Sequence, residues 1–279
     1  MALAVENGTV QMGLWLNESI VEDCSAVDGI VTDSLMSPQI CEILFNESSK
    51  SPCDDVNLRK AIAYCVDNQA VIDNVLYGVG SIPKALGKEG QQGYNPEWET
   101  EYDYYPYDVD KAKEYLAASD YNGETLKIMI MSLPSFESAA LVLQANMQAI
   151  GINCEIESMD LATYLTVTSE GNYTAAIGNY SATDMIQYLV GVYHTKSIGA
   201  SNRTRLNSPE VDALIDKAAA TIDPDERAEV LSECIALIND LCPQVPLYQD
   251  MHMRAYNENL GGVIMYPGGT LYMHAMYWK

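Results

Sequence analysis

The stretch that decides the fold is residues 126–180, LKIMIMSLPSFESAALVLQANMQAIGINCEIESMDLATYLTVTSEGNYTAAIGNY. Three of its segments are rich in apolar residues and predict strands: 126–131, 153–158 and 173–180. Between them, Ser135 can cap a helix that runs to Gly151, and Asp160 can cap a shorter helix. A strand–helix–strand–helix–strand series predicts a largely parallel sheet with right-handed crossovers.

Helices with clear start signals flank this unit. The signals are Asp or Ser residues that precede amphipathic runs, at Asp55, Asp108, Ser208 and Asp223. After Ser208 and after Asp223, a proline occupies the first helical position and acidic residues follow it. Pro243 ends the last of these helices. The fold class predicted from this order is α/β.

A long irregular segment, residues 78–107, separates two of the helices. Its glycines and prolines break regular structure, and it ends in a tyrosine cluster: Tyr102, Tyr104, Tyr105 and Tyr107. Loops of this length inside a compact domain are usually functional. The tyrosines could stack on a ligand or hold the loop against the protein, and we favour the second interpretation.

The two ends of the chain have a different pattern from the middle. They contain short strand-like pieces at 9–16, 29–31, 40–45, 245–249 and 253–256, and an aromatic tail at 272–278. We expect these pieces to be too short to bury a core by themselves.

The net charge of the chain limits the classes of partner that it can bind. It has 279 residues, with 15 Lys and Arg against 39 Asp and Glu, for a formal net charge of -24. Nucleic acid and anionic lipid headgroups repel such a chain, so we expect neither as a partner. The charge can serve solubility, or its field can attract cationic ligands.

The sequence holds no targeting or metal-binding signal. No apolar run approaches the roughly 18–20 residues that cross a bilayer, and Met1–Glu6 lacks the pattern of a signal peptide. The cysteine number is odd and no spacing suits a metal: Cys24, Cys41, Cys53, Cys65, Cys154, Cys234 and Cys242. Either Cys24 with Cys41 or Cys41 with Cys53 could pair, and otherwise we expect small buried hydrophobes.

Several segments match known motifs in order along the chain. They are Phe45-Asn46-Glu47 with Asp54–Asp67, Tyr107–Leu116, Gln144–Ile156, Asp160 with Tyr164 and Leu165, and Pro246-Leu247-Tyr248. Together they resemble the family 5 extracellular solute-binding proteins, the dipeptide-, oligopeptide- and nickel-binding components of ABC importers. The run from Asp54 is similar to the family's Asp-Val-Arg-x-Arg-x-Ala-Ile helix, with Leu58 and Arg59 inside it and Asn68 where arginine is common.

The resemblance implies a periplasmic-binding-protein-like (type II) lobe, with a mixed, largely parallel sheet flanked by helices. It implies three segments: residues 1–48 as a remnant of the first lobe, 49–250 as the second lobe, and 251–279 as a return to the first lobe. The expected function is capture of a solute, most of all a peptide, for the membrane permease of an ABC importer. The expected location is extracytoplasmic, with a lipid anchor and further N-terminal residues in a longer parent protein.

The resemblance also places the ligand site. Ligands of open α/β sheets bind beyond the carboxyl ends of the strands, which points to the loop after the strand at 173–180. The expected ligand-binding residues are Asn179, Tyr180, Ser181 and Asp184. In peptide binders an aspartate of this loop receives the α-ammonium group, and a gapless alignment puts Ser181 at that position. Asp184 could take the role, or it could simply cap the helix that follows.

Other functions are disfavoured by the motifs that are missing. The sequence has no Gly-x-Ser-x-Gly, His-Glu-x-x-His or phosphate-loop pattern, so we expect no enzyme and no catalytic residue. His194, His252 and His274 are scattered, and we expect packing roles, no metal site and no cofactor. The alternatives that stay open are nickel or another small solute as ligand, and a non-catalytic interaction module.

Overall fold

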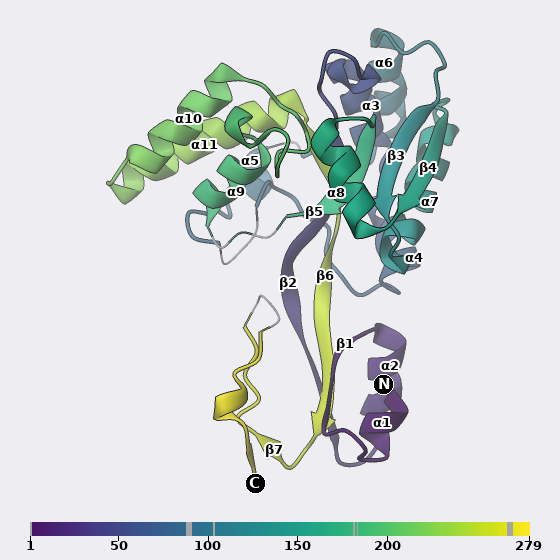
Figure 1. The fold of residues 1–279 in the computed structure, drawn as a ribbon, viewed down its shortest axis with the longest axis vertical. Coiled ribbons are helices and arrows are strands. Elements are labelled where there is room, and N and C mark those ends of the chain that lie inside the picture. Colours follow the sequence, from purple (N-terminus) through teal and green to yellow (C-terminus); the bar gives the residue numbers. More distant parts are fainter. Residues whose placement is uncertain (1, 88–90, 103, 181, 183, 267–269) are drawn as a thin grey trace.

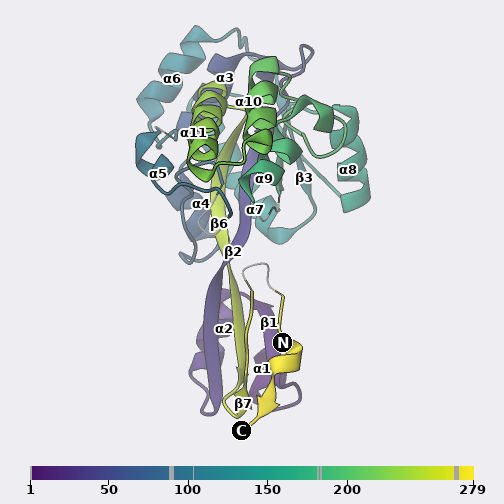
Figure 2. The ribbon, with the colours of Figure 1, turned by 90° about the vertical axis from the view of Figure 1, so that its left-hand side faces the viewer.

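A computed structural model describes residues 2–87, 91–102, 104–180, 182, 184–266 and 270–279. The protein has a larger and a smaller part, joined by the long strands β2 (Ile30–Phe45) and β6 (Gln244–Asn257) (Figure 1). A view turned by 90° shows the same two strands running side by side from one part into the other (Figure 2). Both chain ends lie in the smaller part.

The remaining strands and the helices have the following bounds, in chain order. The other strands are β1 (Met12–Leu16), β3 (Leu126–Met131), β4 (Cys154–Met159), β5 (Ala175–Asn179), β7 (Leu260–Gly261) and β8 (Tyr277–Trp278). The α-helices are α1 (Ala2–Glu6), α2 (Glu18–Ser25), α3 (Val56–Cys65), α4 (Asn68–Val75), α5 (Trp98–Glu101), α6 (Val109–Ala118), α7 (Pro134–Ala149), α8 (Leu161–Glu170), α9 (Met185–Val192), α10 (Pro209–Ala220) and α11 (Pro224–Leu241). Short 3-10 helices cover Pro52–Asp54, Thr195–Ser197 and Met273–Ala275. Within the described residues, the main sheet has the order β1-β6-β2-β5-β3-β4.

The predicted strand–helix series forms the centre of the larger part. β3 pairs in parallel with both β4 and β5, whereas β2 pairs with β5 and β6 in antiparallel fashion. Because side chains alternate along a strand, Ile128 packs with Leu143 of α7 on one face, while Met129 packs with Tyr164 of α8 on the other. The prediction of a mixed sheet flanked by helices is confirmed. The prediction that the sheet is largely parallel is wrong, because β1, β6, β2 and β5 pair with one another in antiparallel fashion.

Most of the predicted helix starts are confirmed. Side chains accept hydrogen bonds from first-turn N–H groups at Asp55, Asp108, Asp160, Ser208 and Asp223. The prediction that Ser135 caps α7 is wrong, because the helix begins at Pro134 and Leu133 is its N-cap residue, without a side-chain cap. A proline suits this first position because its missing N–H would have no partner inside the helix.

Four of the short strand-like pieces near the two ends are not separate elements. The pieces at 29–31 and 40–45 belong to β2, and those at 245–249 and 253–256 belong to β6. The β2–β6 register shifts between Met36 and Ile40 and again between Cys41 and Glu42. Such bulges interrupt the alternation of apolar and polar residues, so each long strand looks like two short ones in the sequence.

The pieces at the two ends, expected to be too short to bury a core by themselves, bury a small one together. Val5, Leu16, Cys24, Met253 and Ala255 form a small buried cluster in the smaller part. It exists because β6 continues out of the larger part and pairs with β1, so that α1 and α2 have a sheet to cover.

The segment at 78–107 is held against the larger part by its aromatic residues. Trp98 Nε1 donates to Ser232 Oγ at 2.9 Å, and Tyr102 donates to the Ser232 carbonyl at 3.0 Å. The Tyr105 hydroxyl donates to the Asn239 carbonyl. Ser232 and Asn239 belong to α11, so three of the segment's rings anchor it to that helix. This supports the holding role for Tyr102 and Tyr105, whereas Tyr107 is exposed.

The cysteines are all free and buried, so neither of the two possible pairings forms. In the part of the chain that the structure describes, no helix has both the length and the apolar character needed to cross a bilayer.

Candidate functional site

A cavity of about 370 Å³ lies where the two long strands leave the larger part. Its walls come from β1, β2 and β6, from the segments that follow α4 and β3, and from the end of β5. They include polar and aromatic side chains in both parts of the protein: Trp15, Asn17, Ser37, Gln39, Tyr77, Ser135, Asn179, Tyr248, Asp250 and His252. The cavity is therefore at the junction of the two parts.

Strand β6 supplies three of the polar side chains that line the cavity. Tyr248, Asp250 and His252 follow one another at every second position, so they point to the same face of the strand. Burial lowers the pKa of His252 and raises the pKa of Asp250, where a hydrogen bond from the Met251 N–H acts in the opposite direction. Both shifts favour the neutral forms, because removing water penalises charge.

Trp15 is aimed at the cavity by a bulge in β1. The register with β6 steps from Leu14 opposite Arg254 to Leu16 opposite Met253, so Trp15 has no partner residue on β6 in this register. Its φ of 57° is left-handed, which is uncommon for a bulky residue. The indole meets the His252 ring edge to face at 4.2 Å and is 61% exposed. Bulges often re-aim a side chain in this way.

Asn179 is the one described residue of the predicted site that lines this cavity. It ends β5, and its Nδ2 lies 3.5 Å from Gln39 Oε1 of β2. Its position follows from topology, because the carboxyl end of β5 opens at the junction of the two parts.

The other predicted residues lie elsewhere. The Tyr180 ring packs near Tyr188 of α9, with centroids 6.3 Å apart. Asp184 caps α9 by accepting from the Gln187 N–H at 2.7 Å, and it lines a separate hollow of about 340 Å³ beside α11. Ser181 lies outside the described residues. A role for Tyr180, Ser181 or Asp184 in ligand binding stays a prediction.

The geometry of Asp184 gives a stability prediction. Asp184→Ala is expected to lower the free energy of unfolding by about 1 kcal/mol, because the N–H of Gln187 loses its acceptor. Chemical denaturation measures the loss, and affinity for ligand is measured on the same variant. A loss of affinity much larger than the loss of stability would assign Asp184 to the ligand instead.

The described histidines and acidic residues form no additional candidate metal site. His194 is buried, where its Nδ1 accepts from the Lys196 N–H at 3.1 Å and its Nε2 lies 3.4 Å from an Asp216 oxygen. In the described ranges, no group of three or more His, Cys, Asp or Glu side chains is arranged to hold a metal ion.

Sequence reasoning missed the contributions of Trp15 and of Asp250 to this cavity. A signal for Asp250 was available, since Tyr248, Asp250 and His252 alternate in a way that suits one continuous strand. Trp15 had no such signal, because an extra residue in a strand leaves no fixed mark in the sequence.

Comparison with known proteins identifies the family. The family described as bacterial extracellular solute-binding proteins, family 5 (middle), matches residues 1–199. The chain belongs to this family. Family 5 relatives include heme-binding protein A of Haemophilus influenzae, 29% identical over 82% of this chain, and the oligopeptide-binding protein OppA of Bacillus subtilis, 28% identical over 84%.

The same fold occurs in solved structures. The ABC transporter substrate-binding protein CtaP of Listeria monocytogenes superimposes with a TM-score of 0.90 over 99% of this chain, at 20% identity. The chain covers 57% of that structure, and 43% and 44% of the two curated relatives. It thus spans less than half of the curated relatives it matches.

Proposed function

We propose that the protein containing this chain captures a peptide outside the cytoplasm and delivers it to the membrane permease of an ABC importer. The observation that carries the proposal is the cavity at the junction of the two parts, lined from both sides by polar and aromatic groups. Sites of this size with a few polar groups between apolar walls suit small ligands. Family membership and the peptide-binding names of several relatives support the ligand class. No catalytic step is part of the proposal.

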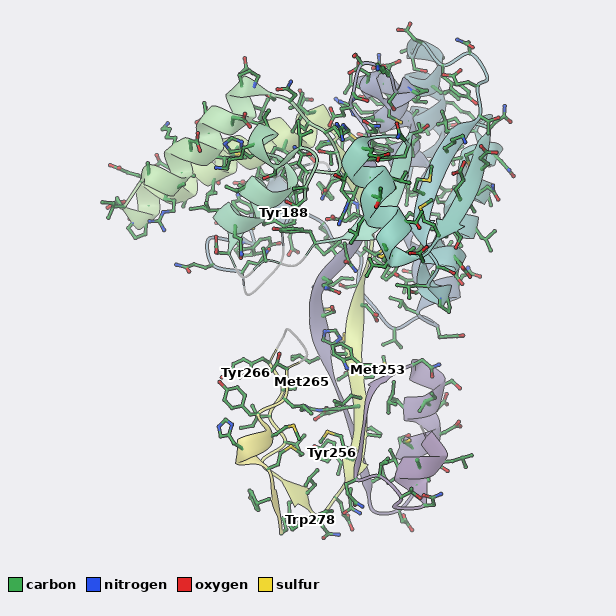
Figure 3. All side chains as sticks on the ribbon, in the orientation of Figure 1. Tyr188, Met253, Tyr256, Met265, Tyr266 and Trp278 are labelled. Atoms are coloured by element: carbon green, nitrogen blue, oxygen red, sulfur yellow. The ribbon has the colours of Figure 1, made fainter. Side chains whose placement is uncertain are left out.

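We also propose how the chain divides. Residues 1–48 and 251–279 belong to the first lobe and residues 49–250 to the second, and a longer parent completes the first lobe. Exposed apolar side chains in the C-terminal segment support this: Ile264, Tyr266, Met273, Tyr277 and Trp278. Figure 3 shows Tyr266 and Trp278 on this segment, in the same part of the molecule as Met253 and Tyr256 of β6. Further residues of the lobe would cover such a surface, and a lipid anchor would precede them.

Ligand identity is tested by native mass spectrometry of the longer parent protein, purified from its own host. The expected result is a bound species with the mass of a short peptide, released on unfolding. A nickel complex, heme or sugar as the only bound species would overturn the choice of ligand.

Calorimetry adds a test of the division. Residues 1–279 should bind tripeptides much more weakly than the parent, since part of one lobe is missing from the ligand's surroundings. Submicromolar binding by residues 1–279 alone would contradict the division into lobes.

A further inference from the structure

The charge inside the cavity is unbalanced. Among the described residues of its lining, Asp250 carries the one formal charge at neutral pH. Burial favours the neutral forms of three other titratable groups of that lining, Cys41, Tyr248 and His252. That lining includes no Lys or Arg to pair with the carboxylate.

Asp250 is positioned to meet a ligand. Its Oδ1 accepts the Met251 N–H at 2.6 Å, and the side chain remains exposed on the cavity side. The surrounding protein nevertheless removes enough water to raise the pKa of the carboxyl. A cation that entered the cavity would favour the ionised form, so binding and ionisation would stabilise each other.

Two aromatic side chains of the lining are presented by strained backbone. Trp15 and Tyr77 have φ of 57° and 52°, and their side chains are 61% and 66% exposed. Exposed large aromatic residues in left-handed conformations are uncommon, and such strain is frequent at ligand clamps. The contact of Trp15 with His252 places the indole two residues along β6 from Asp250. Aromatic faces attract ammonium groups.

We propose that Asp250 forms the ion pair with the ammonium group of the ligand, with the Trp15 indole beside it. The family resemblance implies an aspartate at the position of Ser181, and serine carries no charge that could form this ion pair. The net charge of -24 draws cationic ligands toward the protein and acts in the same direction. The choice of a peptide as the ligand rests on the proposed function. The expectation that the ligand carries a cation rests on the lining of the cavity.

The test uses the longer parent protein and two probes, Ala-Ala-Ala and its N-acetylated form, in calorimetry. The free tripeptide should bind at least about 30-fold more tightly than the acetylated one. Asp250→Asn should remove this preference by weakening the free tripeptide to a similar degree. Asp73→Asn is the matched control, because Asp73 is an exposed carboxylate of α4 outside the cavity lining and should leave both affinities unchanged. Loss of the preference in Asp184→Asn, with Asp250→Asn unaffected, would overturn the proposal.

A second measurement separates the cation site from the peptide. The ¹³C carboxyl signal of Asp250, identified by its loss in Asp250→Asn, should shift with n-butylammonium chloride and remain unchanged with n-butanol. If the protein binds neither tripeptide yet shows this shift, peptide binding fails and the cation site stands. If both tripeptides bind equally and the carboxyl signal does not shift with butylammonium, the assignment of Asp250 as a cation site is wrong and peptide binding stands.

Discussion

Replacing Arg59 by methionine is expected to lower the free energy of unfolding by about 3–5 kcal/mol, the usual cost of breaking a buried ion pair from one side. Arg59 is 3% exposed, and its Nη2 lies 2.9 Å from Glu47 Oε2. The guanidinium also donates to backbone carbonyls that end α11 and precede α3: Cys53, Asp54, Leu241 and Cys242. Methionine keeps much of the volume, so the loss comes from the charge and the donors.

The loss in free energy of unfolding caused by Arg59→Met should depend on pH. Burial raises the pKa of Glu47 to about 7, and the neighbouring Arg59 opposes that rise. Without Arg59 the pKa of Glu47 rises further, so the folded variant holds a proton that the unfolded chain releases above pH of about 4.5. The stability of the variant therefore falls as pH rises from about 4.5 toward and beyond 7. The loss of stability caused by Arg59→Met is accordingly larger at pH 8 than at pH 4.

Urea denaturation at pH 4 and pH 8 measures both effects. Lys60→Met is the matched control, because Lys60 is the next residue and pairs at 3.1 Å with an Asp240 side chain that is 79% exposed. That surface pair should contribute less than about 1 kcal/mol. Equal costs for the two variants would show that Arg59 does not tie the start of α3 to the end of α11.

Trp98→Ala is expected to lower the free energy of unfolding by about 3–5 kcal/mol, because it empties a fully buried site. Trp98 is 0% exposed, and its ring meets the ring of Tyr94 edge to face at 5.5 Å. The substitution also leaves Ser232 Oγ without the indole donor at 2.9 Å. The segment at 78–107 should then loosen from α11, since Trp98 is its largest buried side chain.

Thermal and chemical denaturation of Trp98→Ala measure the loss, and hydrogen exchange locates it. Trp278→Ala is the control, since Trp278 is 58% exposed and should change stability by less than about 0.5 kcal/mol. Unchanged exchange across residues 91–102 in Trp98→Ala would show that other contacts hold this segment.

The long segment illustrates the limit of sequence reasoning. Its tyrosines were recognisable as a cluster, and the holding role that we favoured agrees with the contacts of Tyr102 and Tyr105. Trp98 has no comparable signal in the sequence, although it is 0% exposed. Its partner Ser232 is 134 residues away, and no local pattern records such a distant contact.

The family and the strand–helix series of residues 126–180 could be predicted from the sequence alone. A helix cap such as Asp160 binds N–H groups two and three residues ahead, so its geometry is encoded locally. The parallel unit of β3, β4 and β5 follows from apolar strands that alternate with capped helices. The motifs of family 5 occur in order along the chain, so they needed no coordinates to be recognised.

Only the tertiary structure decided which residues share the cavity. Trp15 reaches it because β1 pairs with β6 and bulges there, and Asp250 because β6 is one continuous strand. Asn179 joins them from the end of β5, whereas Asp184, five residues later, caps α9 beside another hollow. Strand pairing between distant residues and the position of a bulge depend on the whole sheet, because the hydrogen bonds that set them come from other strands.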